Sequence, residues 1–470
     1  MNRLFIALFL LFLGLPASRA AKVKYPGRQT FVYRYYLRDK QGCGFSVDHP
    51  SRFLSPKAIE RRKRQHLRID STDLPVSRKY VDLFRLSGAE VLGTSRWNNT
   101  VVVRSRDSVQ LRQLATLSCV REARMVWMSP DSVEAREDVK WNIRSQFQKW
   151  DSVKYDPYGM GRPQIEMLGG ERLHEVGLRG EGVTIAVLDG GFLNADRIPA
   201  LRGLRLAGTR DFVVPQTVAD GTFFTGIDHG TKVLSALAAD APEVMLGAAT
   251  EATYWLLRCE DPDTEMPVEE DYWTMAAEFA DSVGVDVISS SLGYNEYDDG
   301  MGTYRLQDLD GRTALISRSA SLLAHKGIVL CNSAGNSGMN SWKKIGVPAD
   351  ADNILTVGAV SSEGKIAPFS SVGPSQDLRV KPDVVAMGSP ATLISGKGML
   401  TRDMGTSFST PLISGLVACL WQGLPGKTAL EIIDLVRQNA TLYEEPDNVY
   451  GYGVPDFWRA YMVGKMQDEK

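Results

Sequence analysis

The chain has 470 residues and a formal net charge of −2, with 43% hydrophobic and 23% charged residues. This length allows one large domain together with a smaller one. A charge balance so close to neutral gives no reason to expect nucleic acid or a membrane surface as a partner, and we expect neither.

The first 20 residues, MNRLFIALFLLFLGLPASRA, combine a basic start, an apolar run from Leu4 to Leu15 and small residues at the end. This pattern predicts a cleavable secretory signal over residues 1–20. A membrane anchor is the alternative, but the apolar run is well short of the roughly 20 residues that a spanning helix needs. We therefore expect an exported protein, periplasmic or secreted, without stable membrane insertion.

Residues 21–130 form a basic segment with 22 Lys and Arg against 9 Asp and Glu, whereas the chain from Asp131 onward has a net charge of −17. Opposite charges predict that this segment docks on the domain that follows it, and an anionic partner outside the chain is the alternative. The RRKR run at 61–64 could be a basic processing site. We interpret it instead as the solvated face of a helix.

The residue patterns inside this basic segment predict a compact α+β module. They indicate a strand at 31–37, helices at 54–65, 77–88 and 108–118, and a hairpin-like pair of strands over 89–105. The next residues, 131–159, are polar and charged and end in a stretch punctuated by Gly and Pro. This composition predicts a linker that can be cut.

From residue 160 to residue 470, short apolar segments alternate with helical stretches rich in small residues. The strand candidates are residues 183–189, 253–258, 286–293, 327–336 and 354–360. Continuous runs of Val, Ile and Leu separated by helices predict an α/β fold with a parallel sheet covered by helices on both faces.

Three polar residues follow or begin these elements. Asp189 ends an apolar strand, His229 begins a helix of small residues, and Ser407 lies in GTSFSTP at 405–411. Helix capping is the alternative for Ser407, because Ser and Thr cap helix starts and Pro is tolerated at the first positions. The order Asp, His, Ser, with steps of 40 and 178 residues, is one of the chain orders of a Ser-His-Asp triad. The G-x-S-x-G turn of other hydrolases is excluded by Ser409.

Five separated motifs then complete a pattern: VLDGG (187–191), HGT (229–231), SSSLGY (289–294), CNSAGNSG (331–338) and GTSFSTP. With these motifs in family order, the chain resembles the subtilisin-like serine proteases, the subtilases. The resemblance covers roughly residues 160–463 and extends to the arrangement of a signal and a pro-domain before the enzyme. It implies a subtilisin-like doubly wound sheet preceded by a small α+β pro-domain.

The resemblance also implies roles for individual residues. Ser407 matches the nucleophile, His229 the base that takes its proton, and Asp189 the residue that holds the imidazole. Asn336 matches the side chain of the oxyanion hole, although an αL turn residue between glycines is the alternative. The segment Ser291, Leu292 and Gly293 matches the strand that pairs with an extended substrate, with an ordinary buried strand end as the alternative.

The chain departs from the family pattern at positions that shape the pocket without removing a catalytic group. These positions are Gly190, Lys232, Met387, Phe408 and Ser409. The stretch EDPDTEMPVEED at 260–271 has seven acids and no base. Selection of basic substrate side chains is one reading of it. We favour the other, in which Pro267 and the following acids form the first turn of a helix.

No cofactor is required by this chemistry, and structural calcium has no clear motif. DLDG at 308–311 lacks the spaced acidic ligands of a calcium loop, so we expect a surface turn there. The five cysteines are too few and odd in number for a disulfide framework and show no zinc spacing, although one bridge stays open. Cys259, Cys331 and Cys419 lie in apolar surroundings and are expected to be buried thiols.

Together these features predict an exported serine endopeptidase that acts on proteins or peptides and is made as a self-processing precursor. The pro-domain is expected to assist folding and to inhibit the enzyme. Two alternatives remain: a protease-like binding protein without turnover, and a serine esterase on another α/β fold.

Overall fold

The structure is a computed structural model that describes residues 22–23, 29–129, 133–134 and 156–469. The predicted signal at 1–20 therefore lies outside the described residues, as does most of the predicted linker at 131–159. Among the described helices, none has the length and apolar character needed to cross a bilayer.

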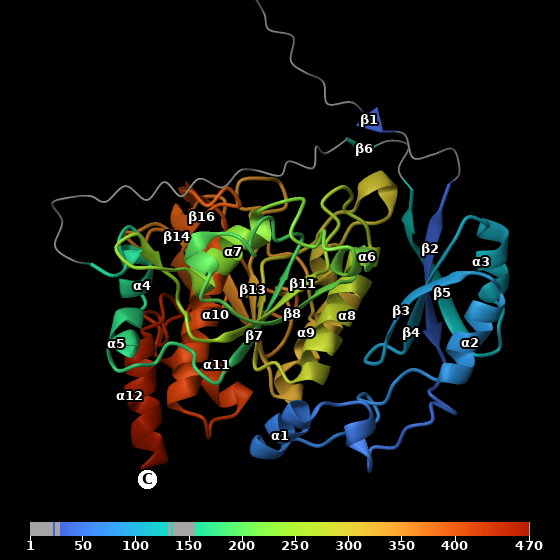
Figure 1. The fold of residues 1–470 in the computed structure, drawn as a ribbon, viewed down its shortest axis with the longest axis horizontal. Coiled ribbons are helices and arrows are strands. Elements are labelled where there is room, and N and C mark those ends of the chain that lie inside the picture. Colours follow the sequence, from blue (N-terminus) through green and yellow to red (C-terminus); the bar gives the residue numbers. More distant parts are fainter. Residues whose placement is uncertain (1–21, 24–28, 130–132, 135–155, 470) are drawn as a thin grey trace, which may run out of the picture.

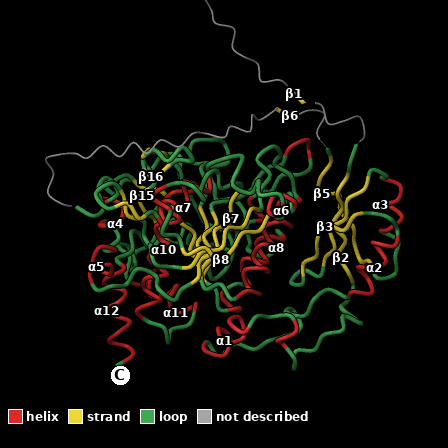
Figure 2. The backbone as a smooth tube through the Cα atoms, in the orientation of Figure 1, coloured by secondary structure: helices red, strands yellow, loops and turns green. Residues whose placement is uncertain are grey.

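A seven-stranded parallel sheet forms the centre of the larger domain (Figures 1 and 2). Its strand order is β15-β14-β13-β12-β7-β11-β8, so the chain passes from β7 to the edge strand β8, returns to β11, and then continues outward on the other side of β7 from β12 to β15. The strands are β7 (Thr184–Asp189), β8 (Arg205–Asp211), β11 (Thr253–Arg258), β12 (Val287–Ser290), β13 (Val329–Ser333), β14 (Leu355–Val360) and β15 (Val384–Met387). This arrangement confirms the expected doubly wound α/β fold.

Helices cover both faces of this sheet, because alternate strand residues bury their side chains on opposite sides. Ile185 and Val187 of β7 belong to a core with α7 (His229–Ala238), α10 (Thr406–Gly423) and α11 (Ala429–Gln438). Ala186 and Leu188 belong to a second core with α8 (Val268–Val283) and α9 (Leu315–Leu322). The remaining elements of this domain are α4 (Arg162–Glu166), α5 (Gly170–Glu175), α6 (Gln216–Ala219), α12 (Phe457–Asp468), β9 (Asp240–Ala241), β10 (Met245–Leu246), β16 (Ala391–Ile394) and β17 (Leu400–Asp403).

The basic segment folds into a four-stranded antiparallel sheet with helices, beside α8 in Figure 1. The strand order is β3-β4-β2-β5. Tyr35 and Phe84 belong to a core of its own, whereas Val32, Val102 and Val126 join the core around α8. The elements are β2 (Phe31–Leu37), α1 (Pro56–Arg64), α2 (Arg78–Leu86), β3 (Glu90–Ser95), β4 (Thr100–Ser105), α3 (Ser108–Leu114) and β5 (Val120–Met128), and β1 (Lys22–Val23) pairs with β6 (Val133–Glu134).

Buried ion pairs join this small domain to α8. Arg34 of β2 donates to both carboxylate oxygens of Asp271, at 2.7 and 2.6 Å, and neither side chain is more than 1% exposed. Asp281, fully buried, pairs with Arg61, with Arg62 at 2.9 Å and with Arg96 at 2.5 Å. The predicted docking of the basic segment on the acidic domain is thus what the structure shows.

Glu278 of α8 adds a second kind of contact, because it binds the turn between β3 and β4. Its carboxylate accepts hydrogen bonds from the Ser95 hydroxyl at 2.6 Å and from the backbone amides of Arg96 and Trp97 at 2.9 and 3.0 Å. A carboxylate that accepts several N–H and O–H donors is held firmly in one place. The turn is therefore fixed on the helix by hydrogen bonds as well as by charge.

The interpretation of RRKR at 61–64 as a solvated helix face is wrong for half of its residues. Arg61 and Arg62 are 2% and 1% exposed, whereas Lys63 and Arg64 face solvent. The helix itself was correctly predicted, but the partner that buries its arginines lies about 220 residues away along the chain.

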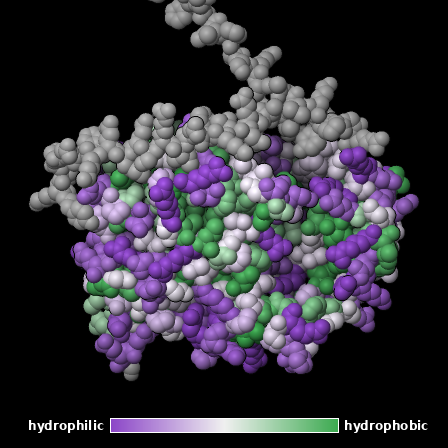
Figure 3. All heavy atoms as spheres, viewed as in Figure 1, coloured by the Kyte–Doolittle hydropathy of each residue, from purple (hydrophilic) through white to green (hydrophobic). Residues whose placement is uncertain are grey.

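On the outer face drawn in Figure 3, hydrophilic residues cover most of the periphery and hydrophobic residues gather in patches near the middle.

Candidate active site

Three of the predicted site residues lie beyond the carboxyl ends of the parallel strands. Asp189 is the last residue of β7, His229 the first residue of α7, and Ser407 the second residue of α10. Asp189 is fully buried, Ser407 is 8% exposed, and the His229 ring is about one third exposed at 33%. This edge of an open α/β sheet is where ligands usually bind.

Asp189 and His229 are joined by hydrogen bonds. The Nδ1 atom of His229 lies 2.9 and 3.0 Å from the two carboxylate oxygens of Asp189, and the Gly190 amide donates to the first of them at 2.8 Å. An anionic acceptor at Nδ1 fixes the proton there and leaves Nε2 as the basic nitrogen. Burial lowers the pKa of His229, but the charge of Asp189 and the hydrogen bond to it raise this pKa to about 9.

Ser407 lies close to this pair without a hydrogen bond to it in the described part of the chain. Its hydroxyl donates to the carbonyl oxygen of Ser291 at 3.4 Å. The following residue, Phe408, has its ring centroid 5.6 Å from that of His229. The N-terminus of α10 is therefore next to the imidazole, with the hydroxyl turned toward the β12 end.

The capping interpretation of Ser407 is wrong. The cap of α10 is Gly405, which has no side chain to offer, and Pro411 lies inside the helix rather than at its first positions. The hydroxyls of Ser409 and Thr410 donate back to the carbonyl of Thr406, at 3.0 and 2.8 Å. Ser407 is thus not used to complete the helix start.

Asn336 reaches the same place from the loop after β13. Its side-chain oxygen accepts the Thr406 amide at 3.0 Å and the Thr406 hydroxyl at 3.1 Å. Because a backbone N–H can only donate, these contacts assign the oxygen. Among the described residues they leave the amide nitrogen as a free donor near Gly405. The positive φ of this loop falls on Gly335, at 102°, and not on Asn336, so the αL alternative for Asn336 does not hold.

The segment Ser291, Leu292 and Gly293 continues β12 toward Ser407. The Ser291 hydroxyl donates to the carbonyl of Ser407 at 2.9 Å, and the side-chain amide of Asn332 donates to the carbonyl of Leu292 at 3.1 Å. Within the part of the chain that the structure describes, the backbone N–H and C=O of Gly293 make no hydrogen bond. An extended strand segment with free backbone groups can pair with another extended peptide.

Two departures from the family pattern have a structural reason. A Cβ atom on Gly190 would lie 2.5 Å from a carboxylate oxygen of Glu260 and 3.2 Å from Ile227, so a side chain there would require the Glu260 side chain to move away. Lys232 projects from α7 to pair with Asp403 at 3.0 Å. Both residues therefore change what lies around Asp189 and His229, and neither forms a hydrogen bond to their side chains other than the Gly190 amide bond to Asp189.

The acidic stretch at 260–271 behaves only in part as predicted. Pro267 precedes α8, and Glu269, Glu270 and Asp271 lie in its first turn, as expected. Glu260, however, lies against Gly190 at the site, a placement that sequence reasoning missed. The number of acids before the helix could have indicated a second role for some of them, because seven acids in twelve residues are more than the first turn of one helix requires.

The predicted surface turn at 308–311 is instead the end of a short 3₁₀ helix, Leu306–Asp308, followed by a bend in which Leu309 is buried. Asp308 accepts the Arg305 amide, and Asp310 accepts the amides of Arg312 and Thr313 at 2.8 and 2.7 Å. All five cysteines are free thiols, and Cys259, Cys331 and Cys419 are fully buried, as expected.

Comparison with known proteins gives the family of the chain. The subtilase family model matches residues 180–453, and a peptidase S8 propeptide domain described for Bacteroidota matches residues 32–142. Subtilisin NAT of Bacillus subtilis subsp. natto is 29% identical over 304 residues, which cover 63% of this chain and 69% of the relative. Subtilisin of Bacillus pumilus is 28% identical over the same length, covering 63% and 96%.

A solved structure shows the same architecture. The chain aligns with MycP1, crystallised with its N-terminal propeptide removed, with a TM-score of 0.50 at 23% identity, over 64% of this chain and 96% of the other. At this identity the likeness concerns the fold alone. The chain belongs to the subtilase family. It is a subtilisin-like serine endopeptidase that carries a propeptide domain.

Proposed function

We propose that this chain is the precursor of an exported endopeptidase that cleaves peptide bonds with Ser407, His229 and Asp189. The observation that carries the proposal is the pair of hydrogen bonds between His229 Nδ1 and Asp189 at the strand edge where α10 begins. A binding protein without turnover would have no use for an imidazole held in this tautomer beside a serine whose hydroxyl, within the described part of the chain, makes only a long 3.4 Å hydrogen bond to the Ser291 carbonyl.

The proposed reaction starts when the Ser407 hydroxyl turns from the Ser291 carbonyl to Nε2 of His229. Oγ attacks the scissile carbonyl carbon as His229 takes its proton, and the imidazolium is stabilised by Asp189. His229 then protonates the leaving amine, and water repeats the sequence on the acyl-enzyme. The amide nitrogen of Asn336 and the backbone N–H of Ser407 are proposed to hold the negative oxygen of the tetrahedral intermediate.

The substrate is proposed to bind as an extended strand along Ser291, Leu292 and Gly293. The unpaired backbone groups of Gly293 support this placement, because an added strand needs free N–H and C=O partners. Such pairing recognises the peptide backbone, so it accepts proteins and peptides of varied sequence. Side-chain preference would then depend on the surroundings of Gly190 and Phe408.

The small domain is proposed to act as a folding assistant and inhibitor that is removed by cutting within residues 131–159. Its buried ion pairs with α8 support a specific docked state rather than a loose tether. The apolar pattern of residues 1–20 supports export before processing. The order of events is export, folding against the small domain, self-cleavage and release.

Self-processing is tested by expressing the full chain beside Ser407→Ala and Ser409→Ala. We expect the wild type and Ser409→Ala to be shortened to the mature domain and to react with a fluorophosphonate probe. Ser407→Ala should stay full length and unlabelled. Equal shortening of all three chains would show that another protease does the processing, and labelling of Ser407→Ala would disprove the assigned nucleophile.

A further inference from the structure

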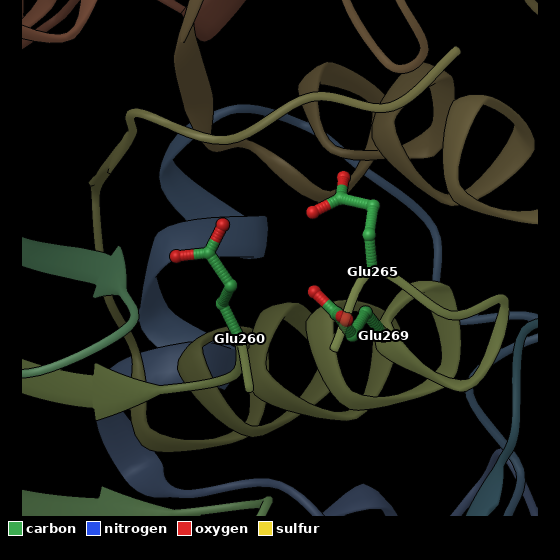
Figure 4. Close-up of side chains that lie close together, drawn as sticks. All are labelled: Glu260, Glu265 and Glu269. Atoms are coloured by element: carbon green, nitrogen blue, oxygen red, sulfur yellow. The ribbon is translucent and has the colours of Figure 1, made fainter. Parts of the chain in front are cut away.

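Three glutamates gather beside the site at the start of α8, as Figure 4 shows. Glu260 follows β11, Glu265 lies in the loop after it, and Glu269 is in the first turn of α8. One carboxylate oxygen from each of them lies within 4.8 Å of those of the other two. Glu269 is fully buried, and the other two are partly exposed.

A second observation shows that this cluster lacks a partner. One carboxylate oxygen of Glu269 accepts the Met266 amide at 3.1 Å, but the other is buried and has no hydrogen-bond partner among the residues that the structure describes. The hydroxyl of Tyr294, a residue 1% exposed, is likewise buried without a partner. A buried carboxylate oxygen left unpaired is costly, which calls for a cation or a donor that the protein itself does not supply.

The charges around Glu269 add to this cost. The carboxylates of Glu260 and Glu265 lie close to that of Glu269, with one oxygen of each within 4.8 Å of the others. None of the three glutamates takes part in an ion pair within the described part of the chain, although such pairs are numerous on α8 itself. The cluster differs in this respect from Asp271 and Asp281 on the same helix, which are each matched by arginine.

We propose that Glu260, Glu265 and Glu269 bind a calcium ion. Oxygen-only ligands suit a hard cation, and three oxygens within 4.8 Å of one another can share a single ion. A cavity of about 310 Å³, lined by residues 260–265 and Asp298, leaves room for the waters that complete the coordination. Calcium fits better than magnesium, because it accepts irregular geometry and more ligands.

The ion would tie the end of β11 to the start of α8 next to Gly190, and so to the strand that carries Asp189. This role is one of stabilisation and is independent of the proposed peptidase activity. A basic side chain of a substrate is the competing occupant, since it would also satisfy the carboxylates. The geometry favours the ion because the unpaired oxygen of Glu269 is buried, and Glu269 is not among the residues that line the cavity.

The test uses the full chain in a Ser407→Ala background, freed of metal with a chelator. Calcium chloride is titrated by equilibrium dialysis into this background, into the same chain with Glu265→Gln and Glu269→Gln, and into a matched control with Asp308→Asn and Asp310→Asn. We expect the background and the control to bind one calcium ion more than the glutamine variant, with a Kd of roughly 1 mM or tighter. Magnesium should bind this site at least about tenfold more weakly.

Thermal unfolding gives a second readout. In chelator, the glutamine variant should unfold at the same or a higher temperature than the background, because repulsion between carboxylates has been removed. Calcium should raise the unfolding temperature of the background and leave that of the glutamine variant where it is. Should the double variant fail to fold, Glu265→Gln alone, at a partly exposed position, is expected to weaken calcium binding about tenfold.

Three results would overturn the proposal. The glutamine variant could bind as many calcium ions as the background, or magnesium could bind the site as tightly as calcium. Argininamide could raise the unfolding temperature of the background but not that of the glutamine variant, while calcium changes the unfolding temperature of neither chain. That last result would assign the cluster to a basic side chain.

Discussion

Arg62 of the small domain and Asp281 of α8 form an ion pair of 2.9 Å in which neither side chain is more than 1% exposed. Arg62 also pairs with the buried Asp73 at 2.7 Å, so a single guanidinium serves two carboxylates. The next residue, Lys63, faces solvent. Neighbours in sequence therefore differ completely in their contribution to docking.

Replacing Arg62 by Ala is expected to loosen α1 from α8, because it removes part of the positive charge around Asp281 and around Asp73, which keeps only Lys326 as a partner. Breaking such a buried pair costs about 3–5 kcal/mol. We expect amide hydrogen exchange over residues 56–64 of the full chain to become about 100-fold faster or more. Lys63→Ala is the control and should leave exchange unchanged. Equal effects of both changes would contradict a buried role for Arg62.

The stability of the docked state should depend on pH through Asp281. Burial raises the pKa of Asp281, but Arg96, Arg61 and Arg62 outweigh this and lower it to about 2. A lowered pKa means that the stabilisation is complete above the unfolded value near 4 and is lost as the pH falls through 2. The effect amounts to about 2 kcal/mol.

This dependence is measured as the free energy of urea unfolding in the Ser407→Ala background, with and without Asp281→Asn. We expect the difference between the two chains to shrink by about 2 kcal/mol between about pH 5 and pH 2. Other carboxylates titrate equally in both chains and cancel. A difference that stays constant over this range would show that Asp281 is not held as a low-pKa carboxylate.

The activity of the processed enzyme should rise with pH toward a plateau above about 9. Nε2 of His229 can accept the Ser407 proton only while the ring is neutral, and the pKa of His229 is raised to about 9. The value of kcat/KM is therefore expected to increase about tenfold per pH unit below this midpoint. A kcat/KM profile already flat from about pH 7 would contradict the raised pKa.

Asp189→Asn should lower kcat about 10⁴-fold, because the tautomer is no longer fixed.

Asn336→Ala should lower kcat by about 100- to 1000-fold with little change in KM, the loss known for such a donor in subtilisin. Ground-state binding is spared because the amide nitrogen meets the substrate oxygen only once it carries negative charge. Asn340→Ala, at an exposed position on the same loop, is the control and should keep full kcat. A change in KM alone would assign Asn336 to substrate binding instead.

Sequence patterns predicted the strands that matter for the site because those strands are continuous apolar runs. The runs ending at Asp189 and at Ser290 are buried along their whole length, and both were found. The edge strand β8, with the sequence RLAGTRD, was missed because it is largely exposed and shows no alternation. β5 was missed for a related reason, since VREARMVWM mixes charged and apolar residues on a sheet with two different faces.

The candidate site followed from motif order, whereas its electrostatic surroundings did not. Asp189 and His229 could be paired in advance because each stands at a recognisable strand or helix end. Nothing local to RRKR shows that Arg61 and Arg62 meet Asp281, and nothing local to the acidic stretch shows that Glu260 lies against Gly190. Such contacts depend on how separate elements pack, which a single sequence pattern does not encode.

The edge of α8 formed by Asp271, Glu278 and Asp281 is covered by arginines and backbone amides of the small domain. Water can replace those donors once the two parts separate, so this edge becomes a hydrated anionic surface rather than a sticky one. An interface of leucines would instead leave an exposed apolar patch on the separated domain, and such patches favour aggregation. Charge along this edge of α8 therefore suits the proposed removal of the small domain, because separation leaves a hydrated surface there.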